Sequence, residues 1–245
     1  MIAALFDVAP SFAGSILGNT TNQSFNKAKK ILLQEVYADH HLTFYCGSEF
    51  DDRGKILFHT GGYQPRKEGE RAYRVEWEHI VPAQAFGQSF AEWRDGHPEC
   101  VDSKGKSFKG RNCAGKMSIP YRYMEADMHN LVPAIGELNG LRSNYSFAMI
   151  PGGQSDFGAC EMKIEDRKAE PPAAVRGNIA RTYFYMDAAY PGRGVVSNKN
   201  RKLFQAWDKA DPVDWWECKR SKRVEMLQGN ANPFVKDRCQ EIGLW

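Results

Sequence analysis

The sequence has no apolar stretch long enough to cross a membrane. A spanning helix needs about 18 or more consecutive apolar residues, and no run within the 245 residues reaches that length. We therefore expect no membrane partner. Within residues 1–22, the stretch 1–17 is apolar and rich in small residues, but it lacks a basic start, and Asp7 and Pro10 interrupt it. This N-terminal lead is either a degenerate signal segment or an unstructured terminus, and residues 23–245 form the domain.

The chain also lacks motifs that would indicate other protein classes. No C-x-x-C pair is present, which argues against a zinc ribbon or a thioredoxin-type site. There is no internal repeat, low-complexity segment or domain linker, so we expect a single large domain. The net charge is only +3 and does not by itself indicate a polyanionic partner.

Six cysteines are present and widely spaced. An even number of such cysteines is typical of disulfides formed in an oxidising compartment. The alternative is a cytosolic protein with six buried thiols, and we favour three disulfides. Cys100 and Cys113 flank a segment rich in glycine and lysine, which a disulfide between them would close as a loop.

Hydrophobic periodicity predicts both helices and strands, and hence an α+β fold. The clearest helix covers residues 24–39, where apolar side chains recur at three- and four-residue spacing behind Ser24, a residue type that suits an N-cap. Further helices are predicted at 173–189, 200–209 and 215–228, and short strands at 42–46 and 159–165.

One predicted strand carries the first candidate site residues. Residues 72–79 alternate as a strand, which places Glu78 and His79 on opposite faces. Both side chains address one site only if the strand ends, twists or bulges at this point. Pro82 agrees with a strand that stops here.

A second strand, predicted over 128–132, leads into a helix over 133–143 that Pro133 suits as a first residue. Gly136 and Gly140 each weaken this helix by about 1 kcal/mol relative to alanine, so it needs a packing or functional reason to form. Asn139 lies at the edge of its apolar face.

These side chains have the chemistry for phosphodiester hydrolysis, which needs an activated nucleophile and neutralisation of the charged transition state. An unperturbed histidine has a pKa of about 6.5, so His79 can take a proton from water at neutral pH. Mg²⁺ prefers oxygen ligands, which Glu78 and Asn139 would supply. A basic run would hold the phosphate backbone. It comprises Lys104, Lys106, Lys109, Arg111, Lys116 and Arg122.

Plainer interpretations compete with each assignment. A Glu-His pair is often a surface pair or a hydrogen-bonded core histidine, Asn before Gly is often part of a turn, and a basic run is often a solvated loop. His79 and His129 could instead bind zinc in a hydrolase, but the H-E-x-x-H spacing is missing. We expect His129 and Asn130 to make hydrogen bonds that stabilise the hairpin.

Several motifs together resemble one known family. EWEHIVPA at 76–83 closely resembles the active-site segment of the endonuclease I family, whose members are periplasmic and secreted nonspecific nucleases. The resemblance spans residues 24–239. The other matching segments are FYCG at 44–47, GYQ at 62–64, MEADMHNL at 124–131, PAIGELNG at 133–140, RGNIARTY at 176–183, WWEC at 215–218 and QGNANPF at 228–234.

The resemblance implies a ββα-metal (His-Me finger) core surrounded by helices. It also implies that His79 is the general base and that Glu78 and Asn139 hold one Mg²⁺, a site that Mn²⁺ or Ca²⁺ could also occupy. Arg111 matches an arginine that contacts the scissile phosphate, but its spacing to Cys113 is one residue shorter than in the family, and Lys109 is the alternative. The implied substrates are double- and single-stranded DNA, and RNA, cut without sequence preference to leave 5′-phosphate ends.

Some family members carry two further cysteines, at the places that Ser48 and Gly61 occupy here. Both partners of one bridge are therefore missing together, which agrees with complete pairing of the remainder. The bridge that would tie the two ends of the chain would contribute on the order of 5 kcal/mol in the loop-entropy view. We predict the pairs Cys100–Cys113, Cys160–Cys218 and Cys46–Cys239.

We therefore predict a monomeric, metal-dependent endonuclease that acts in the periplasm or outside the cell, where an indiscriminate nuclease does not endanger its own genome. The alternative is a nucleic-acid-binding protein on the same scaffold without catalysis. No residue of the implied site is missing, so we rank this alternative lower.

Overall fold

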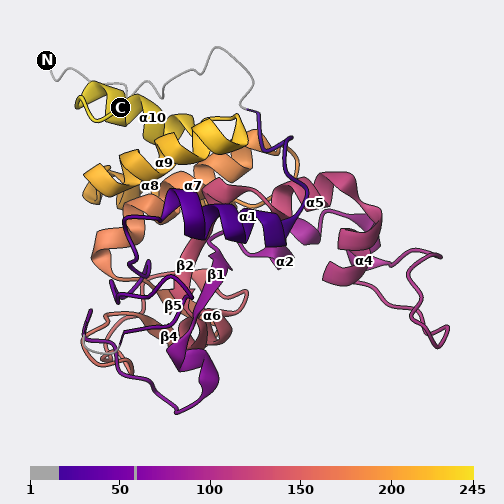
Figure 1. Ribbon diagram of the computed structural model, residues 1–245, viewed down its shortest axis with the longest axis horizontal. Helices are drawn as coiled ribbons and strands as arrows, with labels where there is room; N and C mark the ends of the chain where they lie inside the picture. The colour runs from indigo at the N-terminus through magenta and orange to yellow at the C-terminus, as the bar shows by residue number, and fades with distance from the viewer. Residues whose placement is uncertain (1–16, 58–59) are drawn as a thin grey trace, which may run out of the picture.

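The computed structural model describes residues 17–57 and 60–245, and a hairpin of two antiparallel strands lies at its centre. β1 (Val75–His79) pairs with β2 (Leu131–Ile135), and α6 (Gly136–Arg142) follows β2 directly. Figure 1 shows helices α7 to α10 gathered at one end of the hairpin, with α6 and a second small sheet at the other. The predicted α+β class is therefore confirmed.

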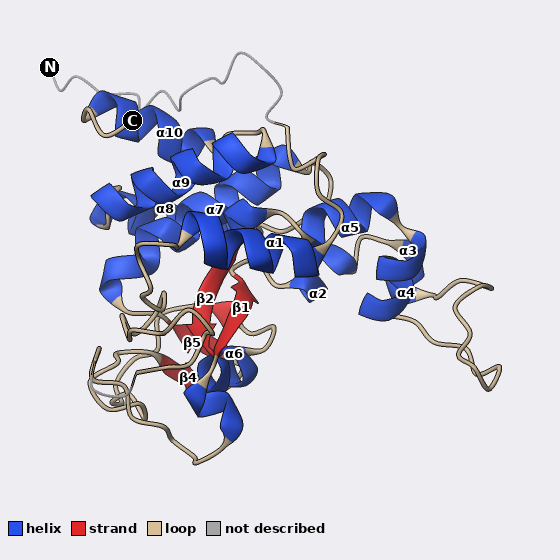
Figure 2. Cartoon of the chain, viewed as in Figure 1, coloured by secondary structure: helices blue, strands red, loops and turns tan. Residues whose placement is uncertain are grey.

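Most of the remaining elements are helices (Figure 2). The α-helices are α1 (Phe25–Ile31), α2 (Ala83–Gly87), α3 (Ala91–Arg94), α4 (Arg111–Met117), α5 (Ile119–Glu125), α7 (Arg176–Ala189), α8 (Asn198–Ala210), α9 (Trp215–Gln228) and α10 (Pro233–Glu241). A π-helical turn covers Leu32–Val36, and 3₁₀ turns cover Glu70–Tyr73, Met128–Asn130 and Ala173–Val175. The second sheet has the order β3 (Ser146–Phe147), β5 (Lys168–Glu170), β4 (Lys163–Glu165).

Capping side chains set where the predicted helices begin. Ser24 accepts a hydrogen bond from the Lys27 backbone N–H at the start of α1, and Asp214 accepts one from the Glu217 N–H at α9. Gly229, in the left-handed conformation, ends α9. The helices predicted in the second half of the chain are confirmed to within a few residues, whereas the first helical segment ends three residues early, at Val36.

The second strand and its helix begin later than predicted. Asp127 accepts a hydrogen bond from the His129 N–H and caps a 3₁₀ turn, so β2 starts only at Leu131. Pro133 lies inside β2, where its carbonyl accepts from Phe44 N at 2.8 Å on the side away from β1. Its missing N–H therefore faces away from the ladder, which is where a strand tolerates proline. The helix consequently starts at Gly136 instead of Pro133.

Other predicted segments also differ. Residues 42–46 form no strand, and Leu42 makes only an isolated bridge to Glu49. The strand predicted over 159–165 is limited to β4. The segment rich in glycine and lysine between Cys100 and Cys113 shows no helical periodicity, yet α4 begins within it at Arg111.

The six cysteines form three disulfides, and one pairing was predicted correctly. Cys100–Cys113 is confirmed. The predictions Cys46–Cys239 and Cys160–Cys218 are wrong, because the bonds are Cys46–Cys160 and Cys218–Cys239.

Local packing explains the corrected pairs. Ala159 N donates to Gly62 O, and Gly61 lies against the Cys46 backbone, so Cys160 comes to lie beside Cys46. α10 turns back onto α9 after Gly229, so the two C-terminal cysteines meet across that helix pair. A Cβ added to Gly61 would lie 2.7 Å from Ser48 N, so the two positions that replace the missing bridge are indeed neighbours.

Residues 1–16 of the predicted N-terminal lead lie outside the described residues. The described part of that lead contacts the folded body: buried Asn19 donates through Nδ2 to Tyr123 O at 2.9 Å, and Thr21 Oγ1 donates to Gln228 O at 2.8 Å. Among the described residues, none of the helices combines the length and apolar character needed to span a bilayer.

Candidate active site

An open pocket of about 650 Å³ lies where β1 ends and α1, α4 and α6 approach it. Three of the predicted site residues line this pocket, namely His79, Arg111 and Asn139. Phe25 and Glu76 also line it. These three residues are up to 60 positions apart in the sequence, and the structure brings them to one pocket. The end of β1 places His79, and helices place Arg111 and Asn139.

His79 is held in one tautomer by the backbone. Its Nε2 lies 2.8 Å from Glu125 O, and the side chain is only 8% exposed. A carbonyl oxygen can only accept, so Nε2 carries the proton and Nδ1 of the neutral ring is an acceptor. Burial, aided by the charge of Arg111, lowers the pKa of His79 to about 3, so the ring is neutral at neutral pH.

Glu125 connects His79 to Arg111. Its backbone carbonyl binds the imidazole, while its carboxylate Oε1 accepts from Arg111 Nε at 2.6 Å and from Tyr121 OH at 3.2 Å. Only Nε of Arg111 is used in this way, and its Nη groups make no hydrogen bond with the described part of the chain. The half-exposed guanidinium is therefore fixed in direction and able to bind an anion in the pocket.

The ring of Phe25 covers the same corner of the pocket. Its centroid lies 4.9 Å from that of His79. The Arg111 guanidinium lies 5.2 Å from this ring and Lys29 Nζ lies 4.8 Å from it. An aromatic face attracts cations, so Phe25 shields the imidazole and gathers two positive charges at the pocket mouth.

Glu78 lies on the other face of β1, away from His79. The ladder pairs Glu78 with Val132 and continues regularly to His79, so no bulge brings the two side chains together. Glu78 Oε1 accepts from Tyr45 OH at 2.7 Å and lies 3.1 Å from Arg142 Nη1. Oε2 is buried and has no hydrogen-bond partner among the described residues. Burial raises the pKa of Glu78 to about 7, although Arg142 and Tyr45 oppose the shift.

Asn139 meets a different carboxylate from the one expected. Its Nδ2 donates to Glu76 Oε2 at 2.9 Å. Glu76 and Glu78 lie two residues apart on the same face of β1, and both face α6. Burial alone would raise the pKa of Glu76, but hydrogen bonds from Arg71, Arg74 and Asn139 leave it below the ordinary value.

The predicted nucleic-acid contacts divide into two groups. Lys104, Lys106 and Lys109 are exposed on a loop between α3 and α4, which projects away from the body in Figure 1 and is closed at its base by the Cys100–Cys113 disulfide. We call residues 101–110 the basic arm. Lys116 donates to Glu99 O, and Arg122 binds Gln23 Oε1 and two carbonyls of α4, so both have intramolecular partners.

The zinc alternative gains no support. His129 Nε2 donates to the carbonyl Asn230 O at 2.9 Å, so this nitrogen carries a proton as that of His79 does. Within residues 17–57 and 60–245, no group of three or more His, Cys, Asp or Glu side chains is arranged to hold a metal ion. The side chain of His129 thus binds outside the hairpin. Asn130 accepts from Val81 N at 2.7 Å and donates to Val81 O at 3.0 Å, so the prediction of stabilising hydrogen bonds at the hairpin is confirmed for Asn130 alone.

Sequence patterns alone did not identify Glu125, Arg142, Phe25 or Glu76 as parts of this site. Glu125 acts through its backbone carbonyl, which no side-chain motif can mark. Glu76 alternates with Glu78 along β1, and this spacing of two was the one available signal for a second carboxylate on the same face.

Comparison with known proteins supplies the family. The family described as Endonuclease I matches residues 20–239. The chain belongs to the endonuclease I family. Two extracellular deoxyribonucleases of Aeromonas hydrophila are 43% and 42% identical over 224 and 243 residues, which cover 89% and 97% of this chain and 91% and 96% of those relatives. A periplasmic deoxyribonuclease of the same organism is 42% identical over 224 residues, covering 89% of this chain and 87% of the relative.

Membership of the endonuclease I family makes the chain a nuclease, and its substrates are nucleic acids. The extracellular and periplasmic relatives indicate a periplasmic or secreted protein, and the three disulfides agree with such an oxidising location.

Proposed function

We propose that this nuclease is a sequence-nonspecific endonuclease in which His79 activates the water that attacks the scissile phosphate. The observation that carries the proposal is the hydrogen bond from His79 Nε2 to Glu125 O, because it leaves Nδ1 free to take a proton beside Arg111. Water oxygen bonds to phosphorus as its proton passes to Nδ1, and the bond to the 3′ oxygen breaks. The phosphate therefore stays on the 5′ end of the downstream product.

Arg111 neutralises the phosphate in this proposal. Its Nη groups make no hydrogen bond with the described residues, and Glu125 fixes Nε, so a phosphate oxygen can bind without reorganising the side chain. Lys109 is the alternative, but it lies in the basic arm and does not line the pocket.

The residues present fit a hard divalent cation. Glu78 Oε2 is buried without a partner, and Asn139 Oδ1 makes no hydrogen bond with the described residues. Carboxylate and amide oxygens suit Mg²⁺, which keeps most of its remaining ligands as water, and Mn²⁺ or Ca²⁺ would accept the same donors. Glu78 and Asn139 would hold the ion, and Mg²⁺ would supply positive charge for the phosphate oxygens during hydrolysis.

The same chemistry supports a broad choice of substrate. No step uses the sugar 2′ hydroxyl or a base edge, so double- and single-stranded DNA and RNA all qualify. Contacts to phosphate position a nucleic acid without reading its sequence. We propose that a monomer is sufficient, because every residue of this site comes from one chain.

Supercoiled plasmid incubated with the oxidised protein tests the proposal. We expect cleavage with Mg²⁺, none with EDTA, and 5′-phosphate ends on the products. His79→Ala should lose at least a hundredfold in rate while still binding DNA, since general base catalysis contributes about 10²–10⁴-fold. His97→Ala, at an exposed histidine outside the pocket, is the matched control. Full turnover in His79→Ala would refute the base assignment, and salt-sensitive binding without any cleavage would favour a non-catalytic protein.

A further inference from the structure

The carboxylate of Glu76 lines the pocket and contacts the proposed ligand Asn139, but the proposed mechanism gives it no role. It receives the Asn139 Nδ2 hydrogen bond at 2.9 Å. Both carboxylates that face α6 thus meet a side chain of that helix, Glu76 with Asn139 and Glu78 with Arg142. Glu76 therefore lies where it can determine how Asn139 faces the pocket.

The chemistry of this contact allows only one orientation of the Asn139 carboxamide. The oxygens of Glu76 accept from N–H donors of Arg71, Arg74 and Asn139. The group that Asn139 turns toward Glu76 must therefore be its NH₂. Oδ1 then points away from Glu76, and it has no partner among the described residues.

Glu76 is itself held in place by arginines. Arg71 donates through Nε to Oε1 at 3.0 Å and through Nη2 to Oε2. Arg74 donates through Nη2 to Oε1 at 2.9 Å. Oε1 therefore faces two guanidinium donors, whereas Oε2 is the atom that Asn139 shares with Arg71.

The two glycines of α6 make room for this cluster. A Cβ added to Gly136 would lie 2.9 Å from Glu76 Oε1, and one added to Gly140 would lie 2.2 Å from Arg71 Nη1. Both distances are too short for real atoms. The two glycines weaken the helix, but they let Arg71 and Glu76 pack against it. This close packing explains why glycine occupies these two positions.

We propose that Glu76 is a positioning residue that holds the carboxamide of Asn139 with Oδ1 presented to a divalent cation. The proposal rests on the proposed function, because it assumes that Asn139 is a ligand. Glu76 is not itself a ligand in this arrangement, since both of its oxygens are engaged by Arg71, Arg74 and Asn139.

Glu76→Gln tests the proposal by reversing the polarity of the contact. Oε1 accepts from both arginines and Oε2 from Arg71 alone, so the amide oxygen of the new side chain would take the Oε1 position and its NH₂ would face Asn139. Asn139 would then turn Oδ1 toward position 76 and NH₂ toward the cation. We expect the affinity for Mn²⁺ alone, measured on the whole protein by electron paramagnetic resonance, to fall about tenfold or more.

A second substitution supplies the rescue. Asn139→Asp carries an oxygen on both sides, so in the Glu76→Gln, Asn139→Asp double variant one oxygen accepts from residue 76 and the other faces the cation. We expect the double variant to bind Mn²⁺ within about threefold of wild type. Asn139→Asp alone places two carboxylates together and should bind less well than the double variant, which completes the cycle.

Glu70→Gln is the matched control, because Glu70 also lies near Arg74 but is exposed and does not contact Asn139. It should leave Mn²⁺ affinity unchanged. Wild-type affinity in Glu76→Gln, or no recovery in the folded double variant, would overturn the positioning role. If the wild-type protein binds no Mn²⁺, the proposed metal site is wrong, and this inference is wrong with it. If wild type and Glu76→Gln bind Mn²⁺ equally, only the positioning role is wrong.

Discussion

Arg142 Nη1 lies 3.1 Å from Glu78 Oε1, and both side chains are 1% exposed. The same guanidinium donates to the carbonyls of His79 at 2.9 Å and Ile80 at 2.7 Å. One buried cation therefore fixes the Glu78 carboxylate on one face of β1 and also binds the backbone of His79, the proposed general base. Arg142 lines the pocket whereas Glu78 does not, so this ion pair links Glu78 to the pocket wall.

Removing this cation should destabilise the whole fold. Arg142→Met leaves Glu78 as an uncompensated buried carboxylate and leaves two carbonyls without their donor. Breaking a buried pair in this way costs about 3–5 kcal/mol. Urea unfolding of the oxidised protein, followed by tryptophan fluorescence, measures the loss.

Arg201→Met is the matched control for this substitution. Arg201 pairs with Asp187 at 2.7 Å, but its side chain is 44% exposed, so its loss should cost less than about 1 kcal/mol. If Arg142→Met were no less stable than Arg201→Met, the guanidinium would not be holding the strand end.

Much of this site follows from local sequence patterns. The alternation of residues 75–79 already places Glu78 and His79 on opposite faces, and β1 keeps that alternation. The capping residues Ser24 and Asp214 mark helix starts that the structure confirms. Local rules succeed here because the hydrogen bonds concerned join residues three or fewer positions apart.

The parts that could not be predicted depend on long-range packing. Cys46 pairs with Cys160 because residues 157–160 run beside 62–64, and no cysteine spacing reveals that neighbour. Likewise, the partner of His79 Nε2 is a backbone carbonyl 46 residues away. Such contacts between distant parts of the chain depend on how the whole core packs. Hydrophobic periodicity along the chain carries no information about this packing.

The basic arm should contribute to binding through charge alone. Lys104 and Lys106 are exposed and lie beyond the pocket, on a loop that starts beside Arg111. Each phosphate contact on duplex DNA makes the slope of log K against log salt more negative by about 0.9. The Lys104→Gln, Lys106→Gln double variant should therefore make that slope less negative by about 1.8, measured by fluorescence anisotropy in a His79→Ala background that we expect not to cut the probe.

Two lysines of α8 provide the control for the arm. Lys199 and Lys202 are equally exposed, but Figure 1 shows α8 at the opposite side of the molecule from the arm. Replacing both by glutamine should leave the slope near that of wild type. An equal change of slope in the two double variants would show that net charge, and not contact through the arm, governs binding.

Asp39 should make the protein sensitive to acid. Hydrogen bonds from Arg223 and then Lys219 hold the pKa of its carboxyl well below the ordinary value. An unfolded Asp titrates near pH 4, so the ion pair stabilises the fold above that pH, and the stabilisation is lost as the pH falls below it. Asp39→Asn should lower the melting temperature slightly at about pH 7, with the difference from wild type shrinking at about pH 3.

Asp237→Asn is the comparison for this acid response. Asp237 is exposed on α10 and forms no ion pair with the described residues. Its melting curve should follow wild type at both pH values. A constant difference between Asp39→Asn and wild type across this range would contradict the ionic origin of the effect.

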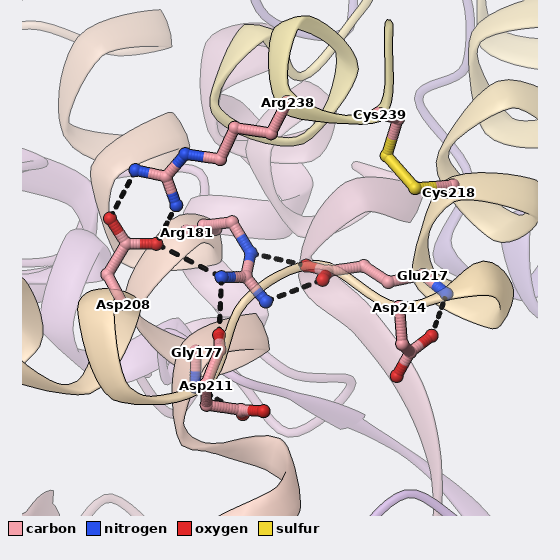
Figure 3. A network of polar contacts seen from close by, with 9 residues as sticks. All are labelled: Gly177, Arg181, Asp208, Asp211, Asp214, Glu217, Cys218, Arg238 and Cys239. Carbon is pink, nitrogen blue, oxygen red and sulfur yellow. Dashed lines mark hydrogen bonds and ion pairs between the residues drawn. A yellow bond between two sulfur atoms is a disulfide. The ribbon is translucent and has the colours of Figure 1, made fainter. Parts of the chain in front are cut away.

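A buried arginine joins the C-terminal helices in Figure 3. Arg181 of α7 is 0% exposed and binds both oxygens of Glu217, at 2.9 and 2.6 Å. It also donates to Asp208 Oδ1 at 3.0 Å and Asp211 O at 2.8 Å. Asp208 in turn pairs with Arg238 of α10. Arg181→Met should therefore cost about 3–5 kcal/mol, since it leaves Glu217 buried without its cation.

The Cys218–Cys239 disulfide should be energetically coupled to this arginine. Its two cysteines directly follow Glu217 and Arg238 in the chain, so the bridge clamps both ends of the charge network (Figure 3). Replacing both by serine should cost about 3 kcal/mol for a loop of this size. Combined with Arg181→Met, the loss should be smaller than the sum by about 0.5–3 kcal/mol, because the bridge and the charge network involve neighbouring residues of α9 and α10. The matched control is the Cys100→Ser, Cys113→Ser variant at the base of the arm, whose loss in the free energy of unfolding should simply add to that of Arg181→Met. Chemical unfolding measures both combinations. Additive losses for both disulfides would contradict the coupling.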